Sequence, residues 1–260
     1  MKQVSALVIS NSEIVPGTHL IWLESQQIAS ASIPGQFVMV RCGEGSEFPL
    51  RRPLSIHQRD GGKIALLFTV VGKGTHWLSQ CRAGDNIDLL GPLGNGYTIY
   101  PDSHNLLLVA GGIGIAPLYL LAQETLNQDC SVTLLLGAST ATQLYPGHLL
   151  SPEVELVITT GDGSKGKKGV ITDLLPDFID RADQIFACGP MPMYGDMYQQ
   201  RETLLKAKPV QVSLEVRMGC GLGVCYGCTV RTKSGLKQVC QDGPVFELTD
   251  ILWDELAYND

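Results

Sequence analysis

The sequence predicts a β + α/β fold in three parts: an antiparallel β-barrel, a doubly wound α/β domain and a small cysteine-rich subdomain. Three observations predict it. Short β-branched runs fill residues 1–100, strand and helix patterns alternate over residues 101–213, and four of the eight cysteines gather in residues 214–260. The 260 residues, 44% of them apolar, are enough for two domains with real hydrophobic cores.

The first hundred residues contain several short apolar runs, each bounded by Gly, Pro, Asp or Ser. These runs are HLIWLE (19–24), QFVMVRC (36–42), IALLFTVVG (64–72) and NIDLLG (86–91). Strands of this length, separated by turn residues, are typical of all-β domains. We therefore expect a small antiparallel barrel or sandwich.

The pattern changes near residue 101. NLLLVA (105–110) is a continuous apolar run, as expected for a strand buried on both faces of a parallel sheet. After a glycine turn, residues 116–126 have apolar side chains at helical spacing, and Pro117 suits the first turn of that helix. Further strands are predicted at 131–138, 155–160 and 184–189. This alternation indicates a doubly wound α/β domain.

Composition excludes several classes of partner. The net charge of −7 argues against nucleic acid, whose phosphates require a basic face. The N-terminus is too polar for a signal peptide, and no apolar run approaches the length of a membrane span. We expect a cytoplasmic protein that does not bind a membrane. In that compartment the isolated Cys42, Cys81 and Cys130 are expected to be buried apolar residues and not ligands.

The last four cysteines have the spacing C-x4-C-x2-C-x11-C, through Cys220, Cys225, Cys228 and Cys240. A disulfide knot is disfavoured in a cytosolic chain. A structural zinc site usually pairs two C-x2-4-C units, and only one is present here. The C-x4-C-x2-C opening matches a plant-type [2Fe–2S] loop, and the interspersed glycines would let backbone N–H groups approach the sulfurs. We interpret the segment as a [2Fe–2S] site, and a structural zinc site is the alternative.

The turn GGIGIAP (111–117) lies between a predicted strand and a predicted helix, where backbone N–H groups can face a phosphate. It is not the usual dinucleotide fingerprint, because Pro117 occupies the third glycine position. No acidic residue ends the next strand, 131–138, to hold a ribose diol.

The order of motifs resembles the ferredoxin–NADP reductase superfamily. RPLS (52–55), GKGT (72–75), GGIGIAP (111–117) and CGP (188–190) stand where that superfamily has its flavin and nucleotide motifs. The resemblance implies a flavin-binding barrel that holds FAD, and an adjoining NAD(H) site. It implies FAD contacts at Arg52, Pro53, Leu54, Ser55, Phe68, Thr69, Val70, Gly74 and Thr75. It implies NAD contacts at Gly111, Gly112, Gly114, Pro117, Asp162, Cys188, Gly189 and Pro190.

Each of these residues has a simple chemical role. Arg52 can pair with the flavin pyrophosphate, Ser55 can donate its hydroxyl to the isoalloxazine edge, and Gly74 and Thr75 can cap a phosphate. Taken singly, each has an ordinary alternative: Arg52 as a surface charge, Thr75 as a turn residue and Cys188 as a buried apolar residue. Their shared order along the chain favours the flavin interpretation.

With the cysteine segment added, the whole chain resembles the electron-transfer subunit of class 1B dihydroorotate dehydrogenase. The resemblance implies a heterotetramer with two copies of an FMN-containing dihydroorotate dehydrogenase catalytic subunit. Electrons would pass from that subunit through [2Fe–2S] and FAD to NAD+, in pyrimidine (UMP) biosynthesis. No residue here is expected to be catalytic towards dihydroorotate, and His57 and His76 are expected only to pack near the flavin or face solvent.

Two alternatives remain at this point. One is a subunit of another NAD(P)H oxidoreductase, of a sulfide dehydrogenase-like or bifurcating kind. The other is a redox sensor without enzymatic activity. NAD is expected over NADP, because residues 137–147, which lie at the adenosine end in this superfamily, contain neither Arg nor Lys. The lysines at 165, 167 and 168 are the only nearby cations that could change this preference.

Overall fold

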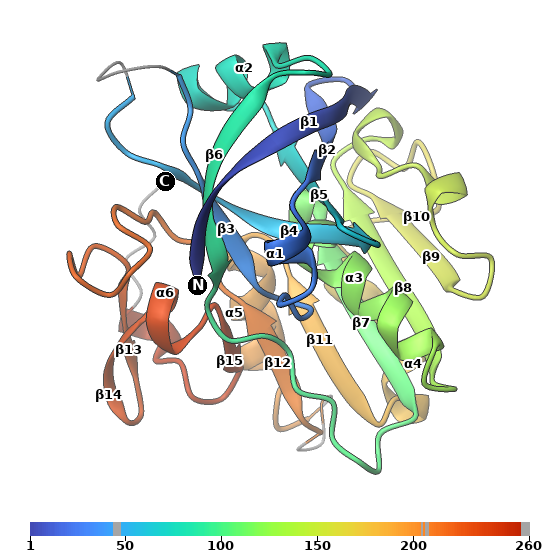
Figure 1. The fold of residues 1–260 in the computed structure, drawn as a ribbon. Helices are drawn as coiled ribbons and strands as arrows, with labels where there is room; N and C mark the ends of the chain where they lie inside the picture. Colours follow the sequence, from blue (N-terminus) through green and yellow to red (C-terminus); the bar gives the residue numbers. More distant parts are fainter. Residues whose placement is uncertain (44–47, 204, 206–207, 256–260) are drawn as a thin grey trace.

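A computed structural model describes residues 1–43, 48–203, 205 and 208–255. Six antiparallel strands close into a barrel in the order β1-β2-β5-β4-β3-β6 (blue to green in Figure 1). The strands are β1 (Lys2–Val15), β2 (Thr18–Glu24), β3 (Phe37–Val40), β4 (Arg52–Asp60), β5 (Lys63–Thr69) and β6 (Asn86–Leu93). Two short helices accompany them, α1 (Gln26–Ala29) and α2 (Lys73–Gln80).

The barrel forms because its strands alternate inward and outward side chains. Along β6 every second residue is buried, and the inward set includes Ile87 and Leu89. These residues meet Ile21, Leu66 and others in one apolar cluster inside the barrel. The barrel prediction is confirmed.

A seven-stranded sheet forms the second layer, in the order β10-β9-β8-β7-β11-β12-β15. Its strands are β7 (Asn105–Gly111), β8 (Ser131–Ala138), β9 (Glu155–Thr160), β10 (Lys167–Lys168), β11 (Gln184–Cys188), β12 (Val210–Ser213) and β15 (Val245–Glu247). All neighbouring pairs are parallel except β12 and β15. The associated helices are α3 (Ile115–Leu126), α4 (Leu175–Phe178) and α5 (Met191–Gln199).

The sheet reverses its winding between β7 and β11. From β7 the chain moves outward to β8 and β9, and it later returns to place β11 on the other side of β7. Ligands of open α/β sheets bind outside the carboxyl ends of the strands at such a reversal. The turns that follow β7 and β11 are GGIG and CGP, so the fold brings these two motifs to one place.

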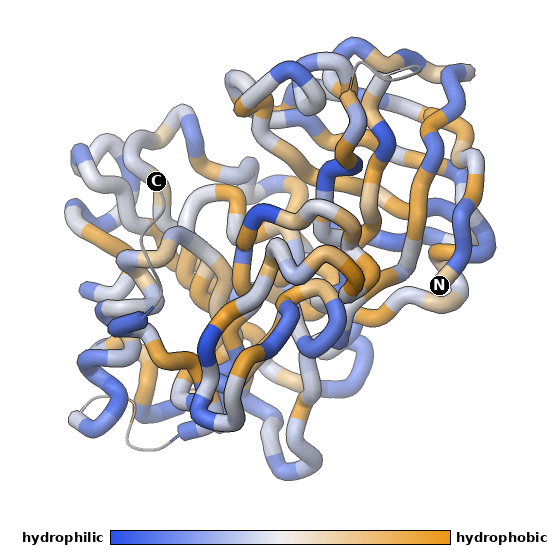
Figure 2. Tube along the Cα trace, turned by 90° about the vertical axis from the view of Figure 1, so that its left-hand side faces the viewer, coloured by the Kyte–Doolittle hydropathy of each residue, from blue (hydrophilic) through white to orange (hydrophobic). Residues whose placement is uncertain are grey.

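The C-terminal segment folds as a hairpin, a helical turn and an edge strand: β13 (Thr229–Thr232), β14 (Gly235–Gln238), α6 (Val239–Asp242) and β15. It does not have a core of its own. Cys228 and Val239 pack in the same apolar cluster as Val212 and Met197 of the α/β domain. In Figure 2 the apolar stretches lie mainly inside the molecule and the hydrophilic ones in the outer loops.

Candidate cofactor and electron-transfer site

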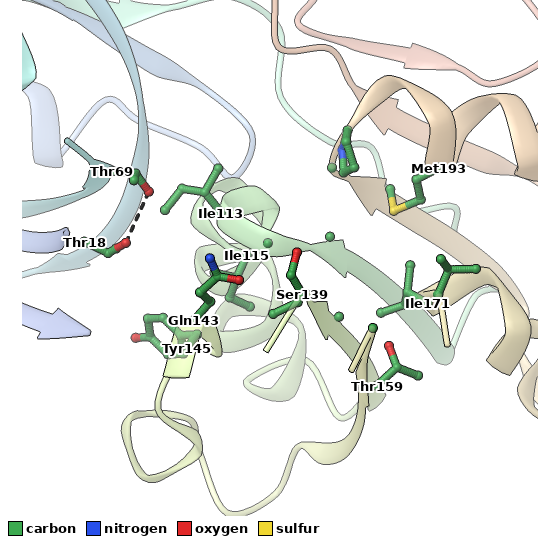
Figure 3. A pocket seen from close by; sticks show the side chains of 18 of the residues that line it. Thr18, Thr69, Ile113, Ile115, Ser139, Gln143, Tyr145, Thr159, Ile171 and Met193 are labelled. Atoms are coloured by element: carbon green, nitrogen blue, oxygen red, sulfur yellow. Dashed lines mark hydrogen bonds between the residues drawn. The ribbon is translucent and has the colours of Figure 1, made fainter. Parts of the chain in front are cut away.

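A cavity of about 740 Å³ opens between the barrel and the carboxyl edge of the parallel sheet (Figure 3). The ends of β7, β8, β9 and β11 form one side through Gly111, Gly112, Gly137, Ser139, Thr159, Gly189 and Pro190. The barrel contributes Thr18, Thr69 and Val71. Two observations show that this cavity is suited to a polar ligand with an apolar body. Most of its wall is apolar, and the buried hydroxyl of Thr159 has no hydrogen-bond partner among the described residues.

The two FAD phosphate motifs meet in space. Arg52 begins β4, and its guanidinium lies against Gly74 in the first turn of α2, where a Cβ atom would lie 2.8 Å from Arg52 Nε. A side chain at position 74 would force the guanidinium to shift. The hydroxyl of Thr75 does not face outward, because it accepts hydrogen bonds from the N–H groups of Val71 (3.0 Å) and Gly72 (3.1 Å). Thr75 therefore shapes the turn, and its hydroxyl is already engaged.

The other barrel residues have different placements. Pro53, Leu54 and Ser55 lie on β4, paired with β3, and are half-buried. Thr69 lines the cavity, and its hydroxyl lies 3.2 Å from that of Thr18. The side chain of Phe68, by contrast, is buried among the core residues of the barrel. Because side chains of adjacent strand residues point to opposite faces, Phe68 can offer a flavin only its backbone. Val70 packs against the same barrel core.

The glycine turn divides into lining and packing residues. Gly111 and Gly112 line the cavity. Gly114 does not line it, because it lies against β11, where a Cβ atom would collide with the carbonyl oxygen of Cys188. Pro117 is buried within α3 and is also absent from the cavity wall. Gly114 and Pro117 pack against neighbouring parts of the domain, and the NAD contacts expected of them stay a prediction.

The CGP motif brings together groups that are far apart in the sequence. Gly189 and Pro190 line the cavity, and the thiol of Cys188, itself fully buried, lies 3.8 Å from Oε1 of Glu215. Glu215 also lines the cavity, and partial desolvation there raises the pKa of its carboxyl. Sequence reasoning did not select Glu215, because only the fold brings it beside the CGP turn.

Asp162 lies in the turn after β9, next to the cavity-lining Gly161, and is not itself part of the cavity wall. Its Oδ1 accepts hydrogen bonds from the N–H (2.9 Å) and the hydroxyl (2.6 Å) of Ser164, which lower the pKa of its carboxyl. The Ser164 hydroxyl in turn accepts from the N–H of Ala141 (2.8 Å). The turn after β9 is thereby fastened to the loop after β8.

The four clustered thiols lie in two pairs, Cys220 with Cys225 and Cys228 with Cys240. Backbone N–H groups point at the sulfurs: those of Leu222 and Gly223 lie 3.3 Å from Cys220 Sγ and 3.2 Å from Cys240 Sγ.

Burial acts to raise the pKa of Cys220, but hydrogen bonds from nearby N–H groups lower it to about 6, which favours the thiolate. Within the described residues, no three His, Cys, Asp or Glu side chains converge on one point as a single metal ion would require. Two thiol pairs with inward-pointing N–H groups are the donor set that a two-iron cluster uses.

The cluster loop rests directly on the barrel. Gly221 has φ +71°, and a Cβ atom there would lie 2.5 Å from Cγ of Met39 on β3. Met39 pairs with Pro53 of the RPLS motif across the β3–β4 ladder. On its other side the loop exposes apolar side chains, with Val224 74% and Tyr226 70% accessible. The cysteine loop thus lies between the flavin motif and the surface.

Three of the other cysteines lie away from the cluster loop. Cys42 and Cys81 are buried in the barrel core, and Cys130 is buried beside β8 in the α/β domain. Of the five histidines, His57 is fully buried and does not face solvent. Among the described helices, none is long and apolar enough to cross a membrane.

Comparison with known proteins agrees with this arrangement. Residues 215–252 match the family described as the iron–sulfur cluster binding domain of dihydroorotate dehydrogenase B. The chain is 41% identical to the dihydroorotate dehydrogenase B (NAD(+)) electron transfer subunit of Desulforamulus reducens, over 97% of this chain and 99% of the relative. It is 37% identical to the protein of the same name from Geobacillus thermodenitrificans, over 94% and 96% of the two chains.

Solved structures show the same fold. One, from a study of flavin-based electron bifurcation by an NADH-dependent reduced ferredoxin–NADP oxidoreductase, is 33% identical with a TM-score of 0.86, over 97% of this chain and 91% of its own. A ferredoxin–NADP+ reductase from Neisseria gonorrhoeae with bound FAD and NADP is 19% identical, with a TM-score of 0.66, over 78% and 92% of the two chains. At that identity the second likeness concerns the fold alone.

Proposed function

The chain belongs to the family of electron-transfer subunits of NAD+-linked dihydroorotate dehydrogenase B, and we propose how its residues perform that role. Electrons from dihydroorotate oxidation pass through a [2Fe–2S] cluster and FAD to NAD+, in pyrimidine (UMP) biosynthesis. The observation that carries the proposal is the contact between the cluster loop and the barrel, through Gly221 and Met39, next to the RPLS strand.

FAD, when bound, joins the one-electron chemistry of the cluster to the two-electron chemistry of nicotinamide. Arg52 and the first turn of α2 at Gly74 would hold the pyrophosphate of FAD. Ser55 would face the isoalloxazine edge. The dinucleotide would lie against the cavity-lining residues at the reversal of the sheet, which are Gly111, Gly112, Gly189 and Pro190. Cys188 and Glu215 would adjoin the nicotinamide end.

The four cysteines would hold the cluster, two on each iron, as their pairing suggests. We also propose the division into a FAD barrel (1–100), an NAD domain (101–213) and a cluster subdomain (214–260). The third part depends on the second for its core, since Cys228 and Cys240 pack with residues of the α/β domain.

The partner is an FMN-containing catalytic subunit, in a heterotetramer of two copies of each chain, working in the cytoplasm. The relatives are named as electron transfer subunits, which implies a catalytic partner. The apolar side chains exposed on the cluster loop, Leu222, Val224 and Tyr226, support docking on that face. We also expect the terminal stretch 247–260 to join this contact; residues 256–260 lie outside the described ones.

Co-expression with the FMN subunit tests the proposal. We expect a complex with equal amounts of FMN and FAD, two irons and two acid-labile sulfides per copy of this chain, and dihydroorotate-dependent reduction of NAD+. The isolated chain should oxidise NADH with artificial acceptors and should leave dihydroorotate untouched. Oxidation of dihydroorotate by the isolated chain would refute this division of labour.

A second candidate is a subunit of a bifurcating NADH oxidoreductase. It is favoured by the 33% identity to the solved oxidoreductase over nearly the whole chain. The same co-expression experiment separates the two: NADH-dependent ferredoxin chemistry without orotate formation would select the bifurcating role.

A further inference from the structure

His57 joins the two domains at a buried point that the proposed function does not use. It lies on β4, two residues after the RPLS motif, and is fully buried. Its Nδ1 lies 3.0 Å from the carbonyl oxygen of Ala116, in the first turn of α3. Its Nε2 lies 3.1 Å from the hydroxyl of Tyr145, in the loop that follows β8. One barrel side chain thus contacts two segments of the nucleotide domain.

The direction of both hydrogen bonds follows from their chemistry. A carbonyl oxygen only accepts, so Nδ1 of His57 carries the proton and donates to Ala116. Complete burial lowers the pKa of His57 to about 4, so the ring is neutral at physiological pH and Nε2 is an acceptor. The hydroxyl of Tyr145 therefore donates to Nε2.

Tyr145 is part of the cavity wall. Its ring lines the cavity beside Gln143 and Ile115, and its hydroxyl points away from Ser139 on the sheet side (Figure 3). The rings of His57 and Tyr145 are in edge contact, with centroids 5.4 Å apart, and Tyr119 packs against both. The hydrogen bond to His57 thus holds the hydroxyl end of Tyr145, and the ring of Tyr145 is the part that a ligand in the cavity would contact.

The same interface has a second anchor that does not reach the cavity. Arg59, two residues further along β4, forms an ion pair of 2.5 Å with Glu124 in the last turn of α3. Leu120, between the two anchors, packs into the barrel core. The β4–α3 interface therefore has one anchor beside the cavity and one remote from it, and the remote one provides a matched control.

We propose that His57 is a positioning residue for NAD(H). By accepting the hydrogen bond of Tyr145, it fixes the Tyr145 ring as a wall of the dinucleotide cavity and ties that wall to the strand that carries the flavin motif. The inference rests on the proposed function in that it takes the cavity as the NAD(H) site.

The test uses the FAD-loaded, cluster-containing chain and measures the dissociation constant of NAD+ by calorimetry, which involves no turnover. His57→Asn keeps a donor near the Nδ1 position and loses the acceptor for Tyr145. His57→Gln keeps an acceptor near the Nε2 position. Tyr145→Phe removes only the hydroxyl, so it carries the test should a His57 variant not fold.

We expect His57→Asn and Tyr145→Phe each to raise the NAD+ dissociation constant about three- to tenfold, the usual worth of one hydrogen bond. The double variant should be no weaker than Tyr145→Phe alone, because that variant already loses the bond to His57 together with the contact between the hydroxyl and Gln58. His57→Gln and the control Glu124→Gln should stay within about twofold of the wild type. With NADH, KM should rise in the first two variants while kcat holds, as expected for lost ground-state binding.

Unchanged NAD+ affinity in Tyr145→Phe would overturn the inference, as would additive losses in the double variant or an equal loss in Glu124→Gln. A wild-type chain that binds FAD and the cluster but no NAD+ would instead overturn the proposed function, and this inference with it. The two failures are therefore distinguishable.

Discussion

Asp162 should make the chain discriminate against NADPH. Asp162 accepts a hydrogen bond from the hydroxyl of Ser164, which itself accepts one from the N–H of Ala141. These bonds hold the ionised carboxylate of Asp162 beside the loop where the adenosine end of the nucleotide is expected. That loop offers no Arg or Lys to a 2′-phosphate. Of the three nearby lysines, Lys167 is engaged with the Asp173 carbonyl and the Asp177 carboxylate.

The magnitude follows from two effects. The missing cation should cost NADPH about one to two decades in kcat/KM, since a charge-assisted bond to phosphate is worth that much. Repulsion by the exposed Asp162 carboxylate should add a further factor of about two to five at low ionic strength. We expect NADH to be preferred about a hundredfold. Asp162→Asn should regain about two- to fivefold for NADPH, with a smaller effect for NADH.

Steady-state kinetics with both nucleotides, at matched ionic strength, measures this preference. Glu153→Gln is the control, because it removes one negative charge from an exposed side chain of the same domain and leaves the contacts of Lys167 intact. Added salt should narrow the gap between wild type and Asp162→Asn, because the repulsion acts through solvent. Equal kcat/KM for NADH and NADPH in the wild type would refute the reasoning. So would equal responses of the two variants.

Three further predictions concern the other parts of the site. Arg52→Ala should weaken FAD binding about ten- to a hundredfold, measured by flavin retention on dilution, and full retention would show that Arg52 does not hold the pyrophosphate. Cys225→Ser should abolish the visible absorption of the cluster and leave FAD bound, and joint loss of both cofactors would contradict separate sites. Gly114→Ala should lower the free energy of unfolding by about 1–3 kcal/mol, because a Cβ atom would meet the Cys188 carbonyl. Gly112→Ala meets no atom within 4 Å, and its cost should be about 1 kcal/mol, from the left-handed backbone at φ +57°.

The sequence predicted those elements whose pattern is local. The apolar run of β7 and the helical spacing of α3 are found within a residue of their predicted bounds. The 14-residue β1 was missed because polar residues interrupt its alternation, and β4 because Pro53 and Arg52 open it. The edge strand β15 has only three residues, and it becomes a strand solely by pairing with β12.

The features of the site likewise fall into those that motif order predicts and those that it does not. Motif order pointed to the meeting of Arg52 with Gly74 and of GGIG with CGP, because these positions follow from the topology of the fold. It could not separate Gly111, which lines the cavity, from Gly114, which packs against β11, since both occupy the same motif. Nor could it find the pairs Cys188–Glu215 and His57–Tyr145, which depend on side-chain placement across distant segments.

The pairing of β15 with β12 has a consequence for how the chain is made. During synthesis the barrel and the parallel strands leave the ribosome first, and β12 remains an open sheet edge until residues 245–247 emerge. An exposed edge strand with unpaired backbone groups is a template for association with other chains. Residues 245–247 therefore cover this edge, and a chain truncated before them would expose the backbone groups of β12 to other chains.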